Sequence, residues 1–356
     1  LSNSNLTVFD RITNRLIDIL QQEPQEAESA LLGGGHYRDW ATAALNSPVG
    51  DVAMSIVQDS RLAEVDAPVD PNVKWLTRLA RLLQLNGDLR RHAIVVLSHH
   101  LGWFHDLTPD WTERHLLSIV DSENIADKEA FWAGVLWNPE VKSPSLFRRI
   151  KPALLDFAKQ PNASREGHVQ ALGHLILWGW LATSGTEDTR YVSHDEFRDV
   201  LLHGGDLFRS QVLWLAERWL HDQSESGLDD KLDQAVEFFR NVWPRQRAVK
   251  NPQMSAGLVH LLVSSRPVFA SLVEVVLPLL TKIERRSHLY MRNEEQVEIV
   301  NRHPGQFLKV LYVVLPDDVS DWPFDIAELL ETIENADGEL VASRPFRELQ
   351  RRWNAR

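Results

Sequence analysis

"DLTPDWTERHLLSIV", residues 106–120, contains the signal that decides the fold of this chain. Thr108 stands directly before Pro109. This pair suits a helix start. A threonine oxygen can accept a hydrogen bond from a free backbone N–H of the first turn, and proline at the first helical position has no N–H that would need a partner. The residues that follow place apolar side chains with a period of about 3.6, the period of an α-helix. The stretch therefore predicts a helix that begins at residue 109.

The same signal recurs along the sequence. Asp70-Pro71 precedes "VKWLTRLARLLQL", and Ser143-Pro144 precedes "LFRRIKPALLDFA". Alternating strand-like stretches flanked by hairpin turns are absent. The sequence therefore predicts an all-α fold.

The predicted helices fall into antiparallel pairs. The pairs are expected to start near residues 71, 109, 144, 193, 228, 267 and 304, a mean spacing of about 39 residues. This spacing is close to the repeat length of HEAT and armadillo proteins, about 40–47 residues. We therefore expect an α-solenoid, with a compact irregular bundle as the alternative. The expected organisation is an N-terminal helical segment or cap over 1–66 and a helical-repeat array over 67–356, which could also form one continuous domain.

Composition limits the class of protein. Of the 356 residues, 44% are hydrophobic and 25% are charged, a balance that supports a large buried core. There is no cysteine, which excludes disulfides and thiolate zinc sites and favours the reducing cytoplasm. The longest apolar run, 171–182, is too short to cross a bilayer, so no membrane partner is expected. Because the first residue is Leu1 rather than Met, we expect the chain to be part of a longer protein.

The histidines of residues 99–120 raise the question of a metal site. On one continuous helix, His100 faces the core and His105 faces away from His99. His92 and His99 share a flank, but seven residues separate them by roughly 10 Å along the helix axis, which is too far for one metal ion. The stretch is therefore predicted to be a helical hairpin with its turn at "DLTPD" and with no metal.

Other candidates for catalysis or cofactor binding also lack essential parts. "LLGGGHYRDW" at 31–40 has no Lys-Ser/Thr after its glycines, so it is not a phosphate loop. "HGGD" at 203–206 has no nucleophile elbow to accompany it, and the acids of "LDDKLD" at 228–233 suit a helix start. The sequence thus predicts no catalytic residue, no cofactor and no enzymatic activity for this chain.

Three basic segments stand out in a chain of net charge −12: "WPRQRAVK" (243–250), "KIERRSHLYMRN" (282–293) and "RPFRELQRRWNAR" (344–356). They could line one ridge of a solenoid and bind an acidic partner, or they could simply form solvated helix faces. The net charge disfavours nonspecific nucleic-acid binding, although these segments leave it open. The predicted partner-binding residues are Arg245, Arg247, Lys250, Arg285, Arg286 and Arg292.

Four stretches together resemble a known group of proteins: "DWATAALNSPVGDVAMSIV", "LGWFHDLTPDWTERHLLSIVD", "EAFWAGVLWNPEVKSPSLFRRIKPALLDFA" and "NRHPGQFLKVLYVVLPD". They resemble the C-terminal helical region of large bacterial anti-phage defence proteins that carry a sirtuin-like NAD-consuming domain or a STAND-type NTPase. The resemblance spans most of residues 37–350 and involves spaced Trp, Pro and Leu residues. No catalytic residue of that group maps onto this chain.

The resemblance implies a non-enzymatic module that senses an invader component or positions an effector domain. Its expected partner is a protein, either a phage component or its own effector domain, and it could form a homo-oligomer through the parent protein. Two alternatives remain at this point. One is a self-assembly platform for its own effector, and the other is a helical enzyme or nucleic-acid-processing domain whose site is built from dispersed residues.

Overall fold

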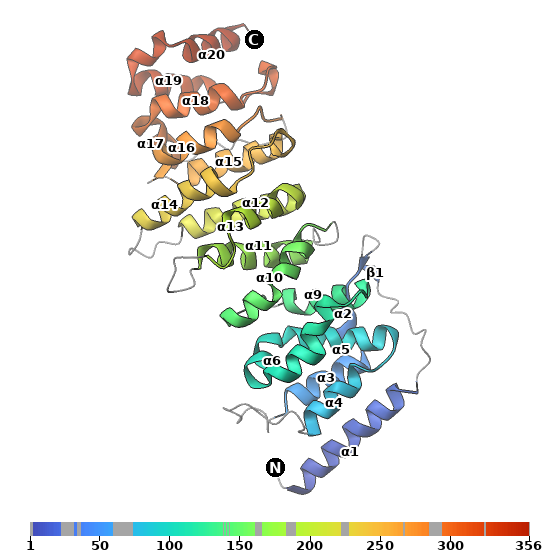
Figure 1. The fold of residues 1–356 in the computed structure, drawn as a ribbon. Helices are drawn as coiled ribbons and strands as arrows, with labels where there is room; N and C mark the ends of the chain where they lie inside the picture. Colours follow the sequence, from blue (N-terminus) through green and yellow to red (C-terminus); the bar gives the residue numbers. More distant parts are fainter. Residues whose placement is uncertain are drawn as a thin grey trace. The chain divides into compact units, whose positions relative to one another are not determined.

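The computed structural model describes most of the chain: residues 3–22, 32–33, 37–59, 74–137, 139, 141, 143–160, 166–182, 190–221, 228–265, 268–284, 294–323 and 325–355. These residues are overwhelmingly helical (Figure 1), so the prediction of an all-α chain is confirmed. Within the described ranges, the strands are two residues long: β1 (Leu32–Gly33) pairs antiparallel with β2 (Tyr37–Arg38).

The chain divides into two compact units. The N-terminal unit comprises Leu1–Phe157, Arg165–Leu175 and Ser184–Tyr191, and the C-terminal unit comprises the remaining residues. The predicted boundary between residues 66 and 67 lies outside the described residues, and it stays a prediction.

The N-terminal unit holds the helices of the first half of the chain. They are α1 (Asn3–Leu20), α2 (Trp40–Leu45), α3 (Pro48–Val57), α4 (Lys74–Leu82), α5 (Gly87–His99), α6 (Leu101–Leu107), α7 (Pro109–Thr112), the π-helical turn η1 (Glu113–Leu117), α8 (Ser118–Asp121), α9 (Ile125–Trp137) and α10 (Pro144–Ala158).

Helix α5 is the centre of this unit. It contacts α2, α3, α4, α9 and η1, and all its residues from His92 to Ser98 are buried. Burying a Val, Ile or Leu side chain stabilises a fold by about 1.5–3 kcal/mol, and α5 buries four in a row from Ile94 to Leu97. An apolar surface on all sides is expected of a helix that neighbours surround.

Helices α5 and α9 approach each other closely at Gly134 of α9. A Cβ atom at this position would lie 2.2 Å from the carbonyl oxygen of Val95 and 2.9 Å from Cβ of Ser98. Only glycine fits here, because any side chain would overlap the backbone of α5. The absence of a side chain at one residue therefore sets the spacing of the two central helices.

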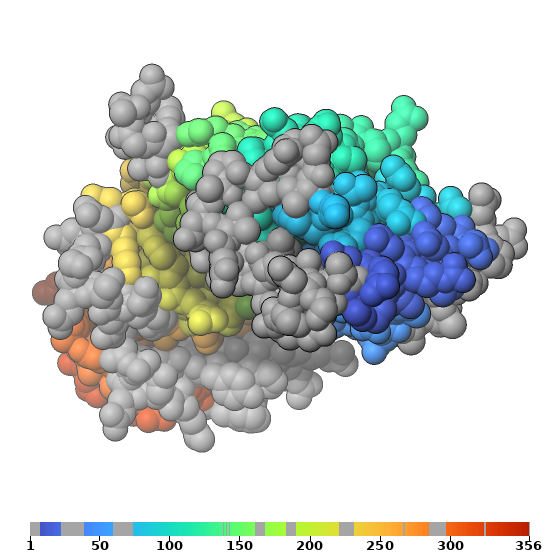
Figure 2. Space-filling view, turned by 90° about the horizontal axis from the view of Figure 1, so that it is seen from below, coloured from blue at the N-terminus to red at the C-terminus, as the bar shows by residue number. Residues whose placement is uncertain are grey.

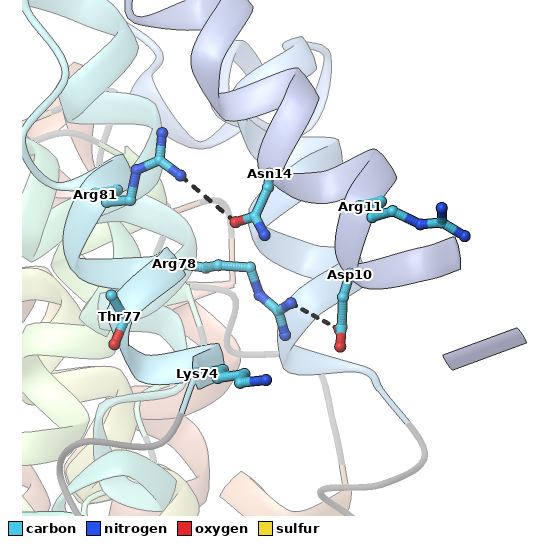
Figure 3. A pocket seen from close by; sticks show the side chains of 7 residues that line it. All are labelled: Asp10, Arg11, Asn14, Lys74, Thr77, Arg78 and Arg81. Carbon is cyan, nitrogen blue, oxygen red and sulfur yellow. Dashed lines mark hydrogen bonds and ion pairs between the residues drawn. The ribbon is translucent and has the colours of Figure 1, made fainter. Parts of the chain in front are cut away.

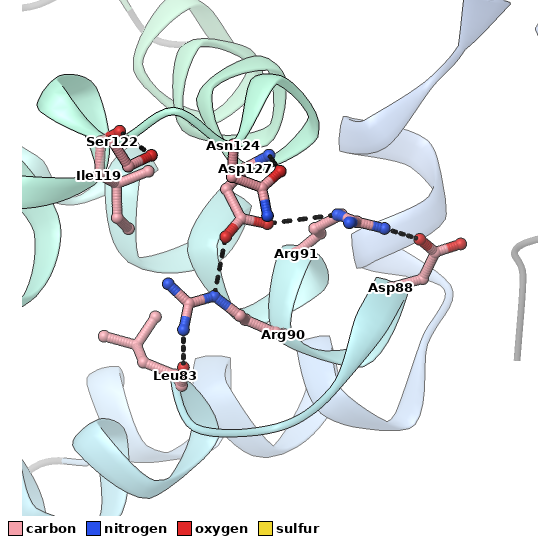
Figure 4. A network of polar contacts seen from close by, with 8 residues as sticks. All are labelled: Leu83, Asp88, Arg90, Arg91, Ile119, Ser122, Asn124 and Asp127. Atoms are coloured by element: carbon pink, nitrogen blue, oxygen red, sulfur yellow. Dashed lines mark hydrogen bonds and ion pairs between the residues drawn. The ribbon is translucent and has the colours of Figure 1, made fainter. Parts of the chain in front are cut away.

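A buried carboxylate joins the same two helices (Figure 4). Asp127, in the first turn of α9, accepts from Nε of Arg90 at 3.0 Å and from Nε of Arg91 at 3.2 Å. Arg91 also donates to Asp88 at 2.8 Å, and its guanidinium lies over the ring of Trp40. Because Asp127 is only 5% exposed, its charge depends on these two arginines, and loss of either would leave a buried charge under-compensated.

The C-terminal unit contains the later helices. They are α12 (His194–His203), α13 (Asp206–His221), α14 (Leu228–Glu237), the π-helical turn η3 (Phe238–Val242), the 3₁₀ turn η4 (Arg247–Val249), α15 (Pro252–Ser264), α16 (Phe269–Val276), η6 (Leu277–Leu279), α17 (Glu294–Arg302), α18 (Pro304–Val314), η7 (Val319–Asp321), α19 (Ile326–Ala336), η8 (Gly338–Ala342) and α20 (Arg344–Asn354). Helix α11 (Glu166–Leu181) contributes residues to both units.

Contacts in the C-terminal unit follow a regular rule: a helix contacts the next helix but one along the chain. One row runs α12, α14–η3, α16, α18, α20, and the other runs α13, α15, α17, α19. Neighbouring helices join the two rows, as α15 does with α16 and α17 with α18. Figure 1 shows these helices following one another in chain order.

Polar contacts repeat along the two rows. Nε2 of His194 lies 2.8 Å from Glu237, Nδ1 of His260 lies 3.1 Å from Glu217, and the Tyr312 hydroxyl donates to Glu348 at 2.9 Å. The partners are 43, 43 and 36 residues apart in the sequence. These separations bracket the predicted mean spacing of about 39 residues.

The predicted helix starts agree with the structure wherever both are described. Helices begin at Pro109, Pro144, His194, Leu228, Phe269 and Pro304, within two residues of the predicted positions, whereas residues 71 and 267 themselves lie outside the described residues. Ser143 caps α10 as predicted, since its Oγ accepts from the backbone N–H of Leu146 at 3.5 Å.

Two details of the histidine-rich segment were predicted wrongly. The assumed continuous helix ends at His99 and resumes at Leu101, with His100 between the two segments. Thr108 does not cap the next helix through its side chain. Its buried hydroxyl instead donates backward to the carbonyl of Phe104 at 3.1 Å, an alternative that backbone-directed threonine side chains often take.

The contact at Gly134 predicts the effect of adding one methyl group. Gly134→Ala should lower the free energy of unfolding by about 1–3 kcal/mol, because the added carbon must displace the backbone of α5. The measurement is urea denaturation followed by circular dichroism. The control is Gly305→Ala in α18, where a Cβ would meet its nearest neighbour, Leu340, at an ordinary 3.7 Å. Equal effects of the two substitutions would contradict the proposed constraint.

Candidate functional site

The structure describes three of the six predicted partner-binding residues. Arg245 and Arg247 lie on the exposed connection between η3 and α15. Lys250 follows them, and its ammonium donates to the carbonyl of Pro278 at 2.5 Å. The remaining three predicted residues, Arg285, Arg286 and Arg292, lie outside the described residues.

Arg240, Arg245 and Arg247 form what we call the arginine surface. All three are exposed, and Nη2 of Arg245 lies 3.4 Å from the carbonyl of Arg240. No carboxylate lies within 4.0 Å of their guanidinium groups in the described part of the chain. Exposed, uncompensated arginines on a chain of net charge −12 are suited to an acidic partner.

Lys250 belongs to a different pattern, in which cations bind the carbonyl ends of neighbouring helices. Arg90 donates to the carbonyl of Leu83, Arg209 to that of Leu201, and Arg352 to that of Pro316, each at 2.7 Å. Positive groups at helix C-termini satisfy free carbonyls and interact favourably with the helix dipole. Part of the basic character of the sequence therefore stabilises the fold rather than forming a binding surface.

A short motif that recurs in the sequence was not recognised from the sequence alone. "GDLRR" at 87–91 and "GDLFR" at 205–209 share a glycine, an aspartate and an arginine at the same spacing. In both, the arginine pairs with the aspartate three residues before it: Arg91 with Asp88 at 2.8 Å, and Arg209 with Asp206 at 2.6 Å. The motif forms the first turn of α5 and begins one residue before α13, so it marks the start of both helices.

A cavity of about 700 Å³ lies between α1 and α4 in the N-terminal unit (Figure 3). Seven residues line it, all of them polar or charged: Asp10, Arg11, Asn14, Lys74, Thr77, Arg78 and Arg81. Sequence analysis did not identify these residues as a site.

Two arginines of α4 reach across to α1. Nη1 of Arg78 lies 2.7 Å from Asp10. Nη2 of Arg81 lies 2.5 Å from Asp18 and 2.9 Å from Oε1 of Gln21. The two contacts are a turn apart on α4, so both guanidinium groups lie on the face toward α1.

Arg78 is unusually deep for a charged residue. Its side chain is 5% exposed, and its Nε atom is buried without a hydrogen-bond partner among the described residues. A buried donor that lacks a partner costs about 1–3 kcal/mol, and more when the group is charged. The cavity therefore retains an unused hydrogen-bond donor on a buried cation.

The histidine-rich segment forms an aromatic cluster. The rings of His99 and His100 are 4.7 Å apart, and that of His99 is 4.6 Å from the ring of Trp137. Burial, together with the neighbouring His99, lowers the pKa of His100 to about 4, and burial also lowers the pKa of His99. Both imidazoles are therefore neutral near pH 7. No group of three His, Asp or Glu residues within the described ranges is arranged to hold a metal ion.

The chain is distantly similar in sequence to a known protein. No protein family model matches the chain, and no solved structure matches it. A protein of Sinorhizobium fredii strain NBRC 101917 / NGR234, named "Uncharacterized protein y4cA", is 20% identical over 315 residues, which is 86% of this chain. The chain spans about a quarter of the length of this relative, 26%. None of the described helices is long and apolar enough to cross a membrane.

The lowered pKa of His100 predicts a loss of stability in acid. Unfolding restores the ordinary pKa of 6.5, so the unfolded chain binds a proton that the folded chain excludes. The free energy of unfolding should fall as pH drops from about 6.5 to about 4. In His100→Gln this fall should be smaller, as measured by the melting temperature at each pH.

His260 provides a control of opposite sign. The hydrogen bond that His260 donates to the Glu217 carboxylate raises the pKa of His260, so its stabilising contribution is present at low pH and is lost as pH rises through the raised pKa. His260→Gln should therefore slightly increase the loss of stability in acid. If His100→Gln retains the full acid dependence of the unaltered chain, the assignment to His100 is wrong.

Proposed function

We propose that the chain is a non-enzymatic recognition and scaffold segment built as an α-solenoid. The observation that carries this proposal is the rule that each helix of the C-terminal unit contacts the next helix but one. Repeat proteins have contacts of this kind, since each repeat buries its apolar face against its neighbours. The polar contacts at separations of 36–43 residues support the same arrangement.

The proposed partner is a protein with an acidic surface, and the proposed contact is the arginine surface. Three exposed guanidinium groups without a carboxylate partner attract an acidic protein as it diffuses toward the surface. Each can then form a pair of hydrogen bonds with a carboxylate. Opposite charge of this kind adds to the rate and specificity of association more than to its strength.

The proposed biological setting is bacterial defence against phages, in the reducing cytoplasm. Its support is the resemblance of four stretches between residues 37 and 350 to the helical regions of defence proteins, together with a chain free of cysteine. The matched relative is much longer than the matched segment. That length is compatible with a helical segment serving a larger protein, where it would sense a phage component or position an effector domain.

The test is charge reversal on the arginine surface. A bacterial host that expresses the gene encoding this chain should resist some phages, and Arg245→Glu with Arg247→Glu should abolish that resistance. Each reversed charge at an interface is expected to cost about 1 kcal/mol, so the pair should weaken partner binding about thirtyfold and in a salt-dependent manner. The efficiency of plating measures the effect in cells, and the melting temperature of the purified variant should stay unchanged.

The matched control is Arg347→Glu with Arg351→Glu. Both arginines are exposed on α20 in the same unit, and the change in charge is identical. Resistance should survive in this control. Unchanged resistance in the Arg245/Arg247 variant would contradict the arginine surface as a contact, and an absence of resistance to every phage of a broad panel would contradict the defence setting.

A second candidate function is self-assembly, and an exposed apolar row on α1 favours it. Val8, Ile12, Leu16 and Ile19 are 43%, 54%, 40% and 44% exposed, and their spacing of three or four residues places them along one side of the helix. In Figure 2, α1 lies at the surface of the N-terminal unit. Rows of this type commonly pack against a second helix.

Sedimentation velocity of the purified chain separates the two candidates. Self-assembly through α1 predicts a dimer or larger species that Ile12→Glu converts to monomer, whereas Val297→Glu, at an equally exposed position on α17, should leave it intact. A monomer at about 100 μM, a concentration well above the dissociation constants of stable dimers, would contradict this candidate.

A further inference from the structure

We propose that the cavity between α1 and α4 is a binding site for a small phosphate-bearing anion. This inference is independent of the proposed scaffold function, because it concerns a different unit and a different surface. Its basis is the cavity itself, the charge of its lining, and the buried arginine that it contains.

The lining of the cavity carries excess positive charge. Arg11, Lys74, Arg78 and Arg81 are cationic, and Asp10 is the one carboxylate among the seven lining residues. Arg78 is paired with Asp10 and Arg81 with Asp18, and the exposed Lys74 adds a further positive charge beside these pairs. The whole chain has a net charge of −12, so this concentration of cations is local and is not a property of the composition. A phosphate ester, with a charge of about −1.5 to −2 at pH 7, would be attracted to it.

The groups that would bind the anion are Arg78 and Lys74. Nε of Arg78 is buried and lacks a partner among the described residues, while Nη1 of the same side chain is held by Asp10. Lys74 stands one helical turn earlier on α4 and is exposed, and in Figure 3 its side chain extends toward the same side as Arg78. A guanidinium and an ammonium on one face of a helix form a common arrangement for binding an oxyanion.

The lining also limits what else the ligand can contain. None of the seven residues is aromatic or aliphatic, so the charged and polar ends of their side chains would select the ligand. Its volume lies in the range of small-molecule sites, about 300–1,000 Å³, and exceeds the size of one phosphate group. The site is therefore suited to a compact ligand with one or two phosphates, recognised through its charge.

Asp10 limits the affinity of the site. Its carboxylate already compensates Arg78 at 2.7 Å and would lie close to an incoming phosphate, which it repels. Removing this charge while keeping the shape of the side chain should therefore strengthen binding. A residue that serves only to stabilise the fold would not have this effect.

The experiment is calorimetric titration of the chain of residues 1–356 with inorganic pyrophosphate, at pH 7 and physiological salt. The unaltered chain should bind with a dissociation constant below about 1 mM, and ligand at saturation should raise the melting temperature. ADP should bind about as tightly as pyrophosphate and adenosine should not bind, because the phosphates alone are recognised. Citrate, which carries carboxylates in place of phosphates, should bind at least about tenfold more weakly.

Three variants complete the test. Lys74→Gln should weaken pyrophosphate binding about tenfold, and Asp10→Asn should strengthen it severalfold. The matched control is Arg15→Gln, which removes one positive charge from an exposed position on α1 that does not line the cavity, and it should bind as the unaltered chain does. None of the three positions is in the core, and an unchanged circular dichroism spectrum verifies that each variant is folded.

Three results would overturn the proposal. The first is the absence of binding heat up to about 10 mM pyrophosphate, a concentration at which even weak specific sites fill. The second is an equal loss of affinity in Lys74→Gln and Arg15→Gln, which would show binding to surface charge in general. The third is tighter binding of citrate than of pyrophosphate, which would assign the site to carboxylates.

Discussion

The close approach of α9 to α5 is the constraint on which the N-terminal unit depends. Gly134 allows the two helices to meet backbone to backbone, and Asp127, in the first turn of α9, bridges Arg90 and Arg91 about two turns from that contact. Packing at such short distance and a compensated buried charge reinforce each other, because each holds the other in register. Since α2, α3 and α4 also pack on α5, the position of α5 determines where α4 presents Arg78 and Lys74.

The fold was predictable from the sequence to the extent that it follows from local chemistry. Ser143 before Pro144 caps a helix in the expected manner, and Pro304 begins another. His100 and Thr108 show where local reasoning fails. The apolar helical pattern of the sequence continues through His100, although the helix is interrupted there. A threonine before proline can donate a hydrogen bond to a carbonyl of the preceding helix instead of capping the following one. Tertiary packing decides between such alternatives. The apolar periodicity of the sequence does not show which of them packing favours.

The candidate sites were less predictable, for a related reason. Charge along the sequence identified Arg245 and Arg247, which are exposed, and also Lys250, whose ammonium binds a carbonyl of the same unit. It did not identify the cavity, because Arg78 and Asp10 lie 68 residues apart and meet only when α1 packs on α4. A cation's role depends on whether its nearest acceptor is a helix end, a carboxylate or solvent, and one sequence does not show which of these is nearest.

The two rows of the C-terminal unit also determine how it responds to a pulling force. Among the described helices of this unit, the main contacts run to the next helix and the next but one. A load on α20 is therefore resisted by α18 and α19 before it reaches α16, and the unit yields in short steps of one helix pair rather than in one event. Chains with such local contacts also refold quickly, since little loop closure is required at each step. The unit is in this sense an elastic element, which can extend under load and recover its length.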